Sequence, residues 1–103
     1  MNIDEYADWT DETAIYPKGS ALIYLTLGLN GEAGEVAEYY KKSIRDGTRD
    51  VNKIKKELGD VLWYWVRLCK AYGFIPSDVL EENVKKLSKR LEEGKIGGSG
   101  SDR

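Results

Sequence analysis

Two pairs of acidic residues at helical spacing are the part of this sequence best suited to chemistry. Glu32 and Glu35 are three positions apart, and Glu57 and Asp60 repeat that spacing further along the chain. Residues three apart lie on one face of a helix, with an axial rise of about 4.5 Å between them, so each pair can bind one cation. If the two helices pack antiparallel, the pairs meet and offer the carboxylate oxygens that suit Mg²⁺ or Mn²⁺. The spacing therefore predicts a metal site shared by two helices.

The residues around these acids bear on the alternative interpretation, a solvated acidic face. An acid pair at this spacing most often faces solvent. Both pairs here stand among apolar residues and glycines, and a glycine inside a helix costs about 1 kcal/mol relative to alanine. The glycines concerned are Gly28, Gly31, Gly34 and Gly59. Close approach of a neighbouring helix or of a ligand's phosphates would offset that cost, which favours a packed site.

The remaining side chains exclude several kinds of chemistry. The chain has no histidine and a single cysteine, Cys69, so it has neither the usual Cys/His zinc site nor a Ser/His or Cys/His catalytic arrangement. Its 103 residues carry a formal net charge of −2, which gives no broad cationic surface for a nucleic-acid backbone. We therefore expect chemistry based on carboxylates, lysine, tyrosine or metal-bound water, and no nucleic-acid polymer as a partner.

Apolar residues at intervals of three and four, separated by stop signals, predict the helices that must position the acids. A short helix lies within residues 2–18, a long one runs from about Ser20 to Arg45, a third from the cap Asp50 to Gly73, and a fourth from Pro76 to just before Gly94. The alternation typical of strands is absent. We expect an all-α small helical bundle over residues 1–94, with three main helices and a short N-terminal helix, and a flexible Gly/Ser-rich tail over residues 95–103.

Residues 61–69, VLWYWVRLC, are apolar on most faces of the third predicted helix. Such a helix needs more than one neighbour, so we expect a homodimer or homotetramer whose interface completes the core. The N-terminal residues show no basic region followed by an apolar stretch, and no apolar run is long enough to span a bilayer. These features predict a cytoplasmic protein without a membrane partner.

The acidic pairs and their surroundings together resemble a known family. Glu32-Ala-Gly-Glu35 and Glu57-Leu-Gly-Asp60 are similar to the ExxE…ExxD signature of the MazG-like, all-α nucleoside triphosphate pyrophosphohydrolases. The segments that carry the resemblance are TAIYP at 13–17, LGLNGEAGEVAE at 27–38, KKSIRDG at 41–47, ELGDVLWY at 57–64 and NVKKLSKR at 83–90. The resemblance covers nearly the whole chain, and the combined motif is far more specific than either acid pair alone.

This resemblance implies a reaction and a set of site residues. The reaction is magnesium-dependent hydrolysis of a nucleoside or deoxynucleoside triphosphate at the α–β bond, with monophosphate and pyrophosphate as products and Mn²⁺ as a substitute metal. The implied magnesium ligands are Glu32, Glu35, Glu57 and Asp60, with Glu38 as an additional candidate, and either Glu32 or Glu35 takes the proton. The implied nucleotide-binding residues are Asn83, Lys86 and Arg90. The tail GGSGSDR resembles a loop that folds over phosphates, with a serine where the family has an aspartate.

The same residues admit other interpretations. The chain can instead be a non-catalytic helical module that binds a metal for stability or binds a basic partner. Lys86 and Arg90 can belong to a solvated basic face together with Lys85 and Lys89. The aromatic candidates for stacking on a base are Tyr16, Tyr24, Trp63 and Tyr64, although aromatics at helical spacing more often form the core.

Overall fold

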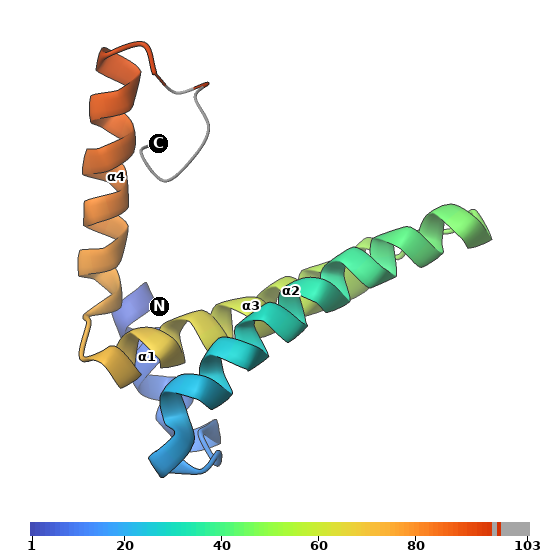
Figure 1. The fold of residues 1–103 in the computed structure, drawn as a ribbon. Coiled ribbons are helices and arrows are strands. Elements are labelled where there is room, and N and C mark those ends of the chain that lie inside the picture. The colour runs from blue at the N-terminus through green and yellow to red at the C-terminus, as the bar shows by residue number, and fades with distance from the viewer. Residues whose placement is uncertain (96, 98–103) are drawn as a thin grey trace.

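In this computed structural model, which describes residues 1–95 and 97, the chain is helical and the described part contains no strand. The elements are α1 (Ile3–Trp9), η1 (Thr10–Thr13), η2 (Lys18–Ser20), α2 (Ala21–Asp46), α3 (Val51–Tyr72) and α4 (Pro76–Glu92) (Figure 1). The prediction of an all-α fold with a short leading helix and three main helices is confirmed. Among the described residues, no helix has an apolar stretch long enough to cross a membrane. Most of the tail, residues 98–103, lies outside the described residues.

Local capping explains where α3 begins and where both central helices end. The carboxylate of Asp50 accepts the backbone N–H of Asn52 at 3.0 Å and so caps the start of α3. Gly47 ends α2 with φ 72° and Gly73 ends α3 with φ 79°, a left-handed conformation that glycine adopts without a steric penalty. The expected long helix from Ser20 to Arg45 is therefore found one residue later at each end.

Helices α2 and α3 form an antiparallel hairpin, joined by a short connection, and lie side by side along its length (Figure 1). Their close approach depends on Gly28. A Cβ atom at this position would lie 2.1 Å from Cε1 of Tyr64, so the tyrosine ring occupies the space that any larger residue would need. The hairpin thereby brings the acids of α2 opposite those of α3.

The N-terminal segment is attached to α3 by a buried arginine. Arg67 is 7% exposed, and its guanidinium donates to the hydroxyl of Tyr16 at 3.0 Å, to that of Thr10 at 3.2 Å and to the carboxylate of Asp11. Lys70, one turn further on, donates to Asp11 at 3.2 Å. A buried charge is tolerated only when paired and hydrogen-bonded, and these partners fulfil that requirement.

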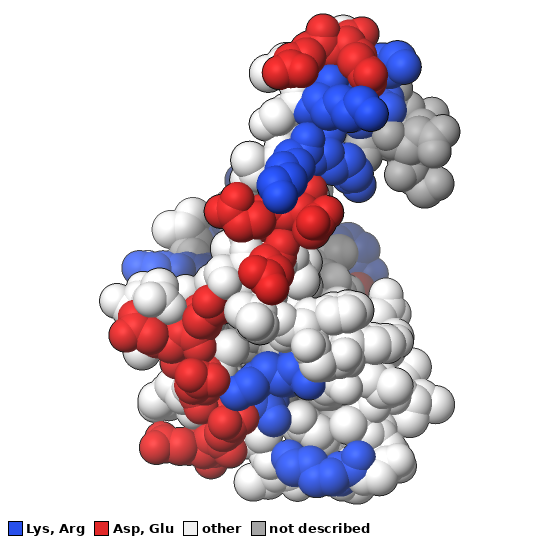
Figure 2. Space-filling view, turned by 90° about the vertical axis from the view of Figure 1, so that its left-hand side faces the viewer, with Lys and Arg blue, Asp and Glu red and all other residues white. Residues whose placement is uncertain are grey.

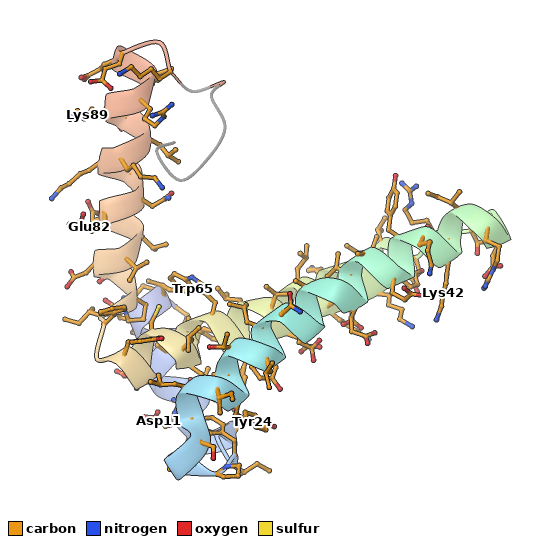
Figure 3. All side chains as sticks on the ribbon, in the orientation of Figure 1. Asp11, Tyr24, Lys42, Trp65, Glu82 and Lys89 are labelled. Carbon is orange, nitrogen blue, oxygen red and sulfur yellow. The ribbon has the colours of Figure 1, made fainter. Side chains whose placement is uncertain are left out.

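The buried core is small and lies at the end of the hairpin nearest α1. Tyr16 and Leu25 are buried there with Ala14, and Trp63 and Tyr64 pack against them. In Figure 3, the labelled Asp11 and Tyr24 lie at this end, whereas Lys42 lies towards the far end of α2. The distal half of the hairpin therefore consists of two helices that cover only each other.

Helix α4 is attached to α1 and α3 and rises away from the hairpin (Figure 1). Its first turn is fixed by Asp4 of α1, whose carboxylate accepts the backbone N–H of Ser77 at 2.9 Å. The apolar stripe of α4 is exposed and consists of Leu80, Val84, Leu87 and Leu91. The radius of gyration is 16.4 Å, against about 13 Å for a compact domain of this length. The single chain thus leaves much apolar surface without intramolecular cover.

Candidate metal centre

Three carboxylates from two helices converge on the face of the α2–α3 hairpin. One carboxylate oxygen from each of three residues lies within 4.8 Å of the other two. The residues are Glu32 in α2, and Glu57 and Asp60 in α3. Glu32 and Glu57 are half-buried and Asp60 is exposed. Because residues three apart share a helix face, the antiparallel pairing places Glu57 and Asp60 together opposite Glu32. We refer to these three residues as the acidic group.

The electrostatics of the acidic group fit a divalent cation. The pKa of Glu32 is raised by burial, and further by the charges of Asp60, Glu57 and Glu35. Every described group that shifts this pKa by its charge is an acid. Like charges held this close repel one another unless a cation compensates them, and an all-oxygen donor set matches Mg²⁺ and Mn²⁺.

The other two acids of the predicted site occupy different positions. Glu35 is exposed, and its carboxylate lies outside the acidic group although its charge acts on Glu32. Glu38 forms an ion pair with Lys41 at 3.0 Å, and this hydrogen bond lowers the pKa of Glu38. The structure therefore brings together three of the five acids, leaves a fourth beside them, and pairs the fifth with a lysine.

Aromatic side chains line both flanks of the acidic group. On one flank, burial raises the pKa of Tyr64, and Tyr24 together with the charges of Glu32 and Asp60 raises it further. On the other flank, burial raises the pKa of Tyr6, and the charge of Asp60 adds to the effect. Tyr6 lies within the short helix predicted for residues 2–18, but no local pattern in the sequence indicates that this helix packs beside the acids.

The four aromatic candidates for base stacking form one connected cluster. Tyr16 stacks on Tyr24 with ring centroids 5.4 Å apart, and Trp63 meets Tyr64 edge-on at 5.0 Å. Tyr16 is buried in the core, so its face is not available to a ligand. The indole N–H of Trp63 donates to the hydroxyl of Thr13 at 2.7 Å, which fixes the orientation of its ring.

The predicted nucleotide-binding residues lie on α4. Asn83 and Lys86 are exposed, whereas Arg90 is half-buried and donates to the carbonyl of Lys95 at 2.6 Å. Figure 2 shows the lysines and arginines of α4 as one basic band between acidic residues at its two ends. Because α4 rises away from the hairpin, this band is not part of the surroundings of the acidic group within one chain (Figure 1).

The four glycines among the predicted site residues differ in whether a Cβ atom would meet a neighbouring side chain. Gly28 has the close helix contact that the sequence predicted, since the Tyr64 ring covers it. A Cβ atom at Gly31, Gly34 or Gly59 would meet no described atom within 4 Å. The surface at these three glycines is open to another molecule.

Comparisons with known proteins agree with the arrangement of these residues. The family model described as the MazG nucleotide pyrophosphohydrolase domain matches residues 22–94, which include all three members of the acidic group and the whole of α4. The Gene 37 protein of Mycobacterium phage L5 is 38% identical to the chain over an alignment of 114 residues that covers 100% of both proteins. No solved structure matches the chain.

Proposed function

We propose, since the chain belongs to the MazG nucleotide pyrophosphohydrolase family, that it hydrolyses nucleoside or deoxynucleoside triphosphates to monophosphate and pyrophosphate with Mg²⁺ as cofactor. The observation that carries the proposal is the convergence of Glu32, Glu57 and Asp60 from two helices on one point. Repulsion between carboxylates disfavours such proximity unless a cation compensates it. Convergence of this kind supports a site for a polyanionic ligand bound through a cation.

The acidic group would hold Mg²⁺, with Mn²⁺ as a substitute, and Glu35 would join as a fourth ligand or act as the base. A bound divalent ion neutralises phosphate charge and lowers the pKa of a coordinated water. The protein's own contribution is to keep the carboxylates in place on rigid helices. Glu38 contributes least in this proposal, because its carboxylate is already paired with Lys41.

The attacking water must lose a proton, and carboxylates are the described side chains near the acidic group that accept one most readily at neutral pH. Glu32 and Glu35 are the two candidates. Glu35 is exposed and lies outside the group of three, so its carboxylate is free to rotate towards a water molecule. We assign the general base to Glu35 and the metal-binding role to Glu32.

A second copy of the chain completes the site in this proposal. The acidic group has no described cation beside Glu32, while Lys86 and Arg90 belong to α4, which rises away from the hairpin (Figure 1). Association through the exposed apolar stripe of α4 would bring the basic band of one copy towards the acids of another. Lys86 and Arg90 would then bind the β and γ phosphates as one leaving unit, with Asn83 beside them. Either a homodimer or a homotetramer satisfies this requirement.

The competing function is a non-catalytic helical module that binds a metal or a basic partner. The two functions differ in their products. Purified protein is incubated with Mg²⁺ and each common triphosphate, and an early sample is separated by anion exchange. We expect monophosphate and pyrophosphate in equal amounts. We also propose that the protein works in the cytoplasm. Diphosphate with orthophosphate as first products contradicts the assignment of the bond, and metal binding without turnover supports the module.

A further inference from the structure

A pocket opens between α1 and α3 directly beside the acidic group. Its volume is about 470 Å³, and it is lined by Tyr6, Trp9, Thr13, Gly59, Asp60 and Trp63. Asp60 belongs both to this pocket and to the acidic group. A molecule that fills the pocket is therefore in reach of whatever the carboxylates bind.

Three aromatic rings form the walls of this pocket. Tyr6 and Trp9 stack on each other, with ring centroids 6.1 Å apart and an interplanar angle of 20°. Trp63 enters from α3, and its hydrogen bond to Thr13 holds it in one orientation. Trp9 remains 47% exposed. An exposed tryptophan beside two other rings offers flat apolar surface to a planar ligand.

Gly59 contributes open space on the α3 side. A Cβ atom there would meet no described atom within 4 Å, so packing inside the chain does not require this glycine. Its presence in the middle of α3 lowers helix stability relative to alanine. A ligand that approaches the backbone at this point gives a reason to omit the side chain.

We infer that this pocket is the nucleobase subsite, and that it holds the base of a purine nucleoside triphosphate by stacking. The inference rests on the proposed function, because that function places the triphosphate at the acidic group. A base between the aromatic walls has its sugar and phosphates directed past Asp60 to the carboxylates. Aromatic stacking accepts any base, and its strength grows with the area of the ring, so purines are preferred over pyrimidines.

The test compares Trp9→Ala with Tyr72→Ala. Tyr72 is a matched control, because it is 55% exposed and stacks on a single aromatic neighbour, Phe74, at 5.5 Å. In Trp9→Ala, KM for a purine triphosphate should rise by about tenfold or more while kcat changes less. Trp9→Phe should recover most of the loss, and Tyr72→Ala should behave as wild type. Circular dichroism checks that each variant is folded.

A second substitution tests the open space at Gly59 instead of the ring of Trp9. Gly59→Ala should stabilise α3 yet raise KM, because its methyl group projects into the pocket. Inorganic tripolyphosphate has no base, so its inhibition constant in Mg²⁺ should be the same in Trp9→Ala and in wild type. Loss of tripolyphosphate binding in Trp9→Ala would overturn the inference, since the ring would then serve the phosphates or the fold.

Binding of a non-hydrolysable α,β-methylene purine triphosphate separates this inference from the proposed function. If this analogue binds wild type but not Trp9→Ala, and no variant hydrolyses triphosphates, the subsite stands and the proposed function fails. If every variant hydrolyses purine and pyrimidine triphosphates as wild type does, the subsite is wrong and the function stands. If Trp9→Ala instead dissociates an oligomer and keeps its affinity for the analogue, the pocket is a contact between subunits and the inference is overturned.

Discussion

Gly28 and Tyr64 are in contact across the α2–α3 hairpin, and the ring of the tyrosine occupies the place of a side chain at the glycine. This contact sets the distance between the two helices. It also positions Tyr64 beside the acidic group, where the charges of Glu32 and Asp60 act on its hydroxyl.

Gly28→Ala should therefore destabilise the protein by about 1–3 kcal/mol, although alanine is the better helix former. The added methyl group would lie within 2.1 Å of the ring, so the helices must separate or the ring must move. Gly31→Ala is the control, because its Cβ atom meets nothing, and it should be neutral or stabilising. Urea unfolding of both variants measures the difference, and equal stabilities would contradict the contact.

Glu35→Gln and Asp60→Asn should keep the fold and lose nearly all triphosphate hydrolysis, because each removes a charge while preserving the shape of the side chain. Glu38→Gln is the matched control on the same helix. It should retain most activity, because the Glu38 carboxylate is bound to Lys41. Wild-type turnover in Asp60→Asn would contradict the site, and loss of turnover in Glu38→Gln would assign Glu38 to it.

Mg²⁺ should raise the melting temperature of the protein in the absence of nucleotide, because the cation relieves repulsion within the acidic group. At a concentration about 100-fold above its Kd, a ligand specific for the folded state adds about 2.7 kcal/mol of stability. Glu32→Gln should melt higher than wild type in EDTA and gain less from Mg²⁺. An identical Mg²⁺ effect in both proteins would show that the ion binds elsewhere.

The ion pairs of Asp11 predict a pH dependence of stability. Hydrogen bonds from Arg67 and then Lys70 hold the pKa of Asp11 below its ordinary value of 3.8. A carboxyl group with a lowered pKa in the folded state stabilises the protein above the ordinary value, and this stability is lost as the pH falls through the lowered pKa. Asp11→Asn should thus be less stable than wild type at pH 7, and the difference should shrink in acid. Glu12→Gln is the control, and a difference for Asp11→Asn that stays constant with pH contradicts the ion pair.

The apolar stripe of α4 predicts association between copies of the chain. Val84 is 58% exposed in the single chain, and Val84→Glu would place a charge within the proposed interface. Light scattering at micromolar concentration should give a multiple of 11.7 kDa for wild type and a smaller mass for Val84→Glu. Lys85→Glu, on the exposed basic face, should leave the mass unchanged. A wild-type mass of one chain contradicts the oligomer.

Features encoded locally could be predicted from the sequence. The cap at Asp50 and the left-handed glycine at Gly73 depend on neighbours a few residues away, so their residue types suffice. The meeting of Glu32 with Glu57 and Asp60 was also predictable, because helical spacing fixes the face and an antiparallel hairpin fixes the partner.

The position of the N-terminal helix was not predictable in this way. It depends on Arg67, which lies within the mostly apolar third predicted helix. No pattern in the sequence indicates that this arginine has partners in the N-terminal segment. Its bonds reach residues 51 and 57 positions earlier in the chain, and no spacing rule identifies such partners. For the same reason the sequence did not reveal that Tyr6 and Trp9 share a pocket with Asp60.

This long-range anchor has a consequence for the order of folding. The α2–α3 hairpin closes a connection of a few residues, whereas the docking of α1 through Arg67 must close a loop that spans most of the chain. Loop-closure entropy makes the second event the later one, and segments that dock last tend to open first in native-state fluctuations. The amide protons of α1 should exchange with solvent faster than those of central α3, because the hairpin can persist while the N-terminal helix detaches. Each such opening removes two of the three aromatic rings of the pocket, Tyr6 and Trp9, while the acidic group stays assembled.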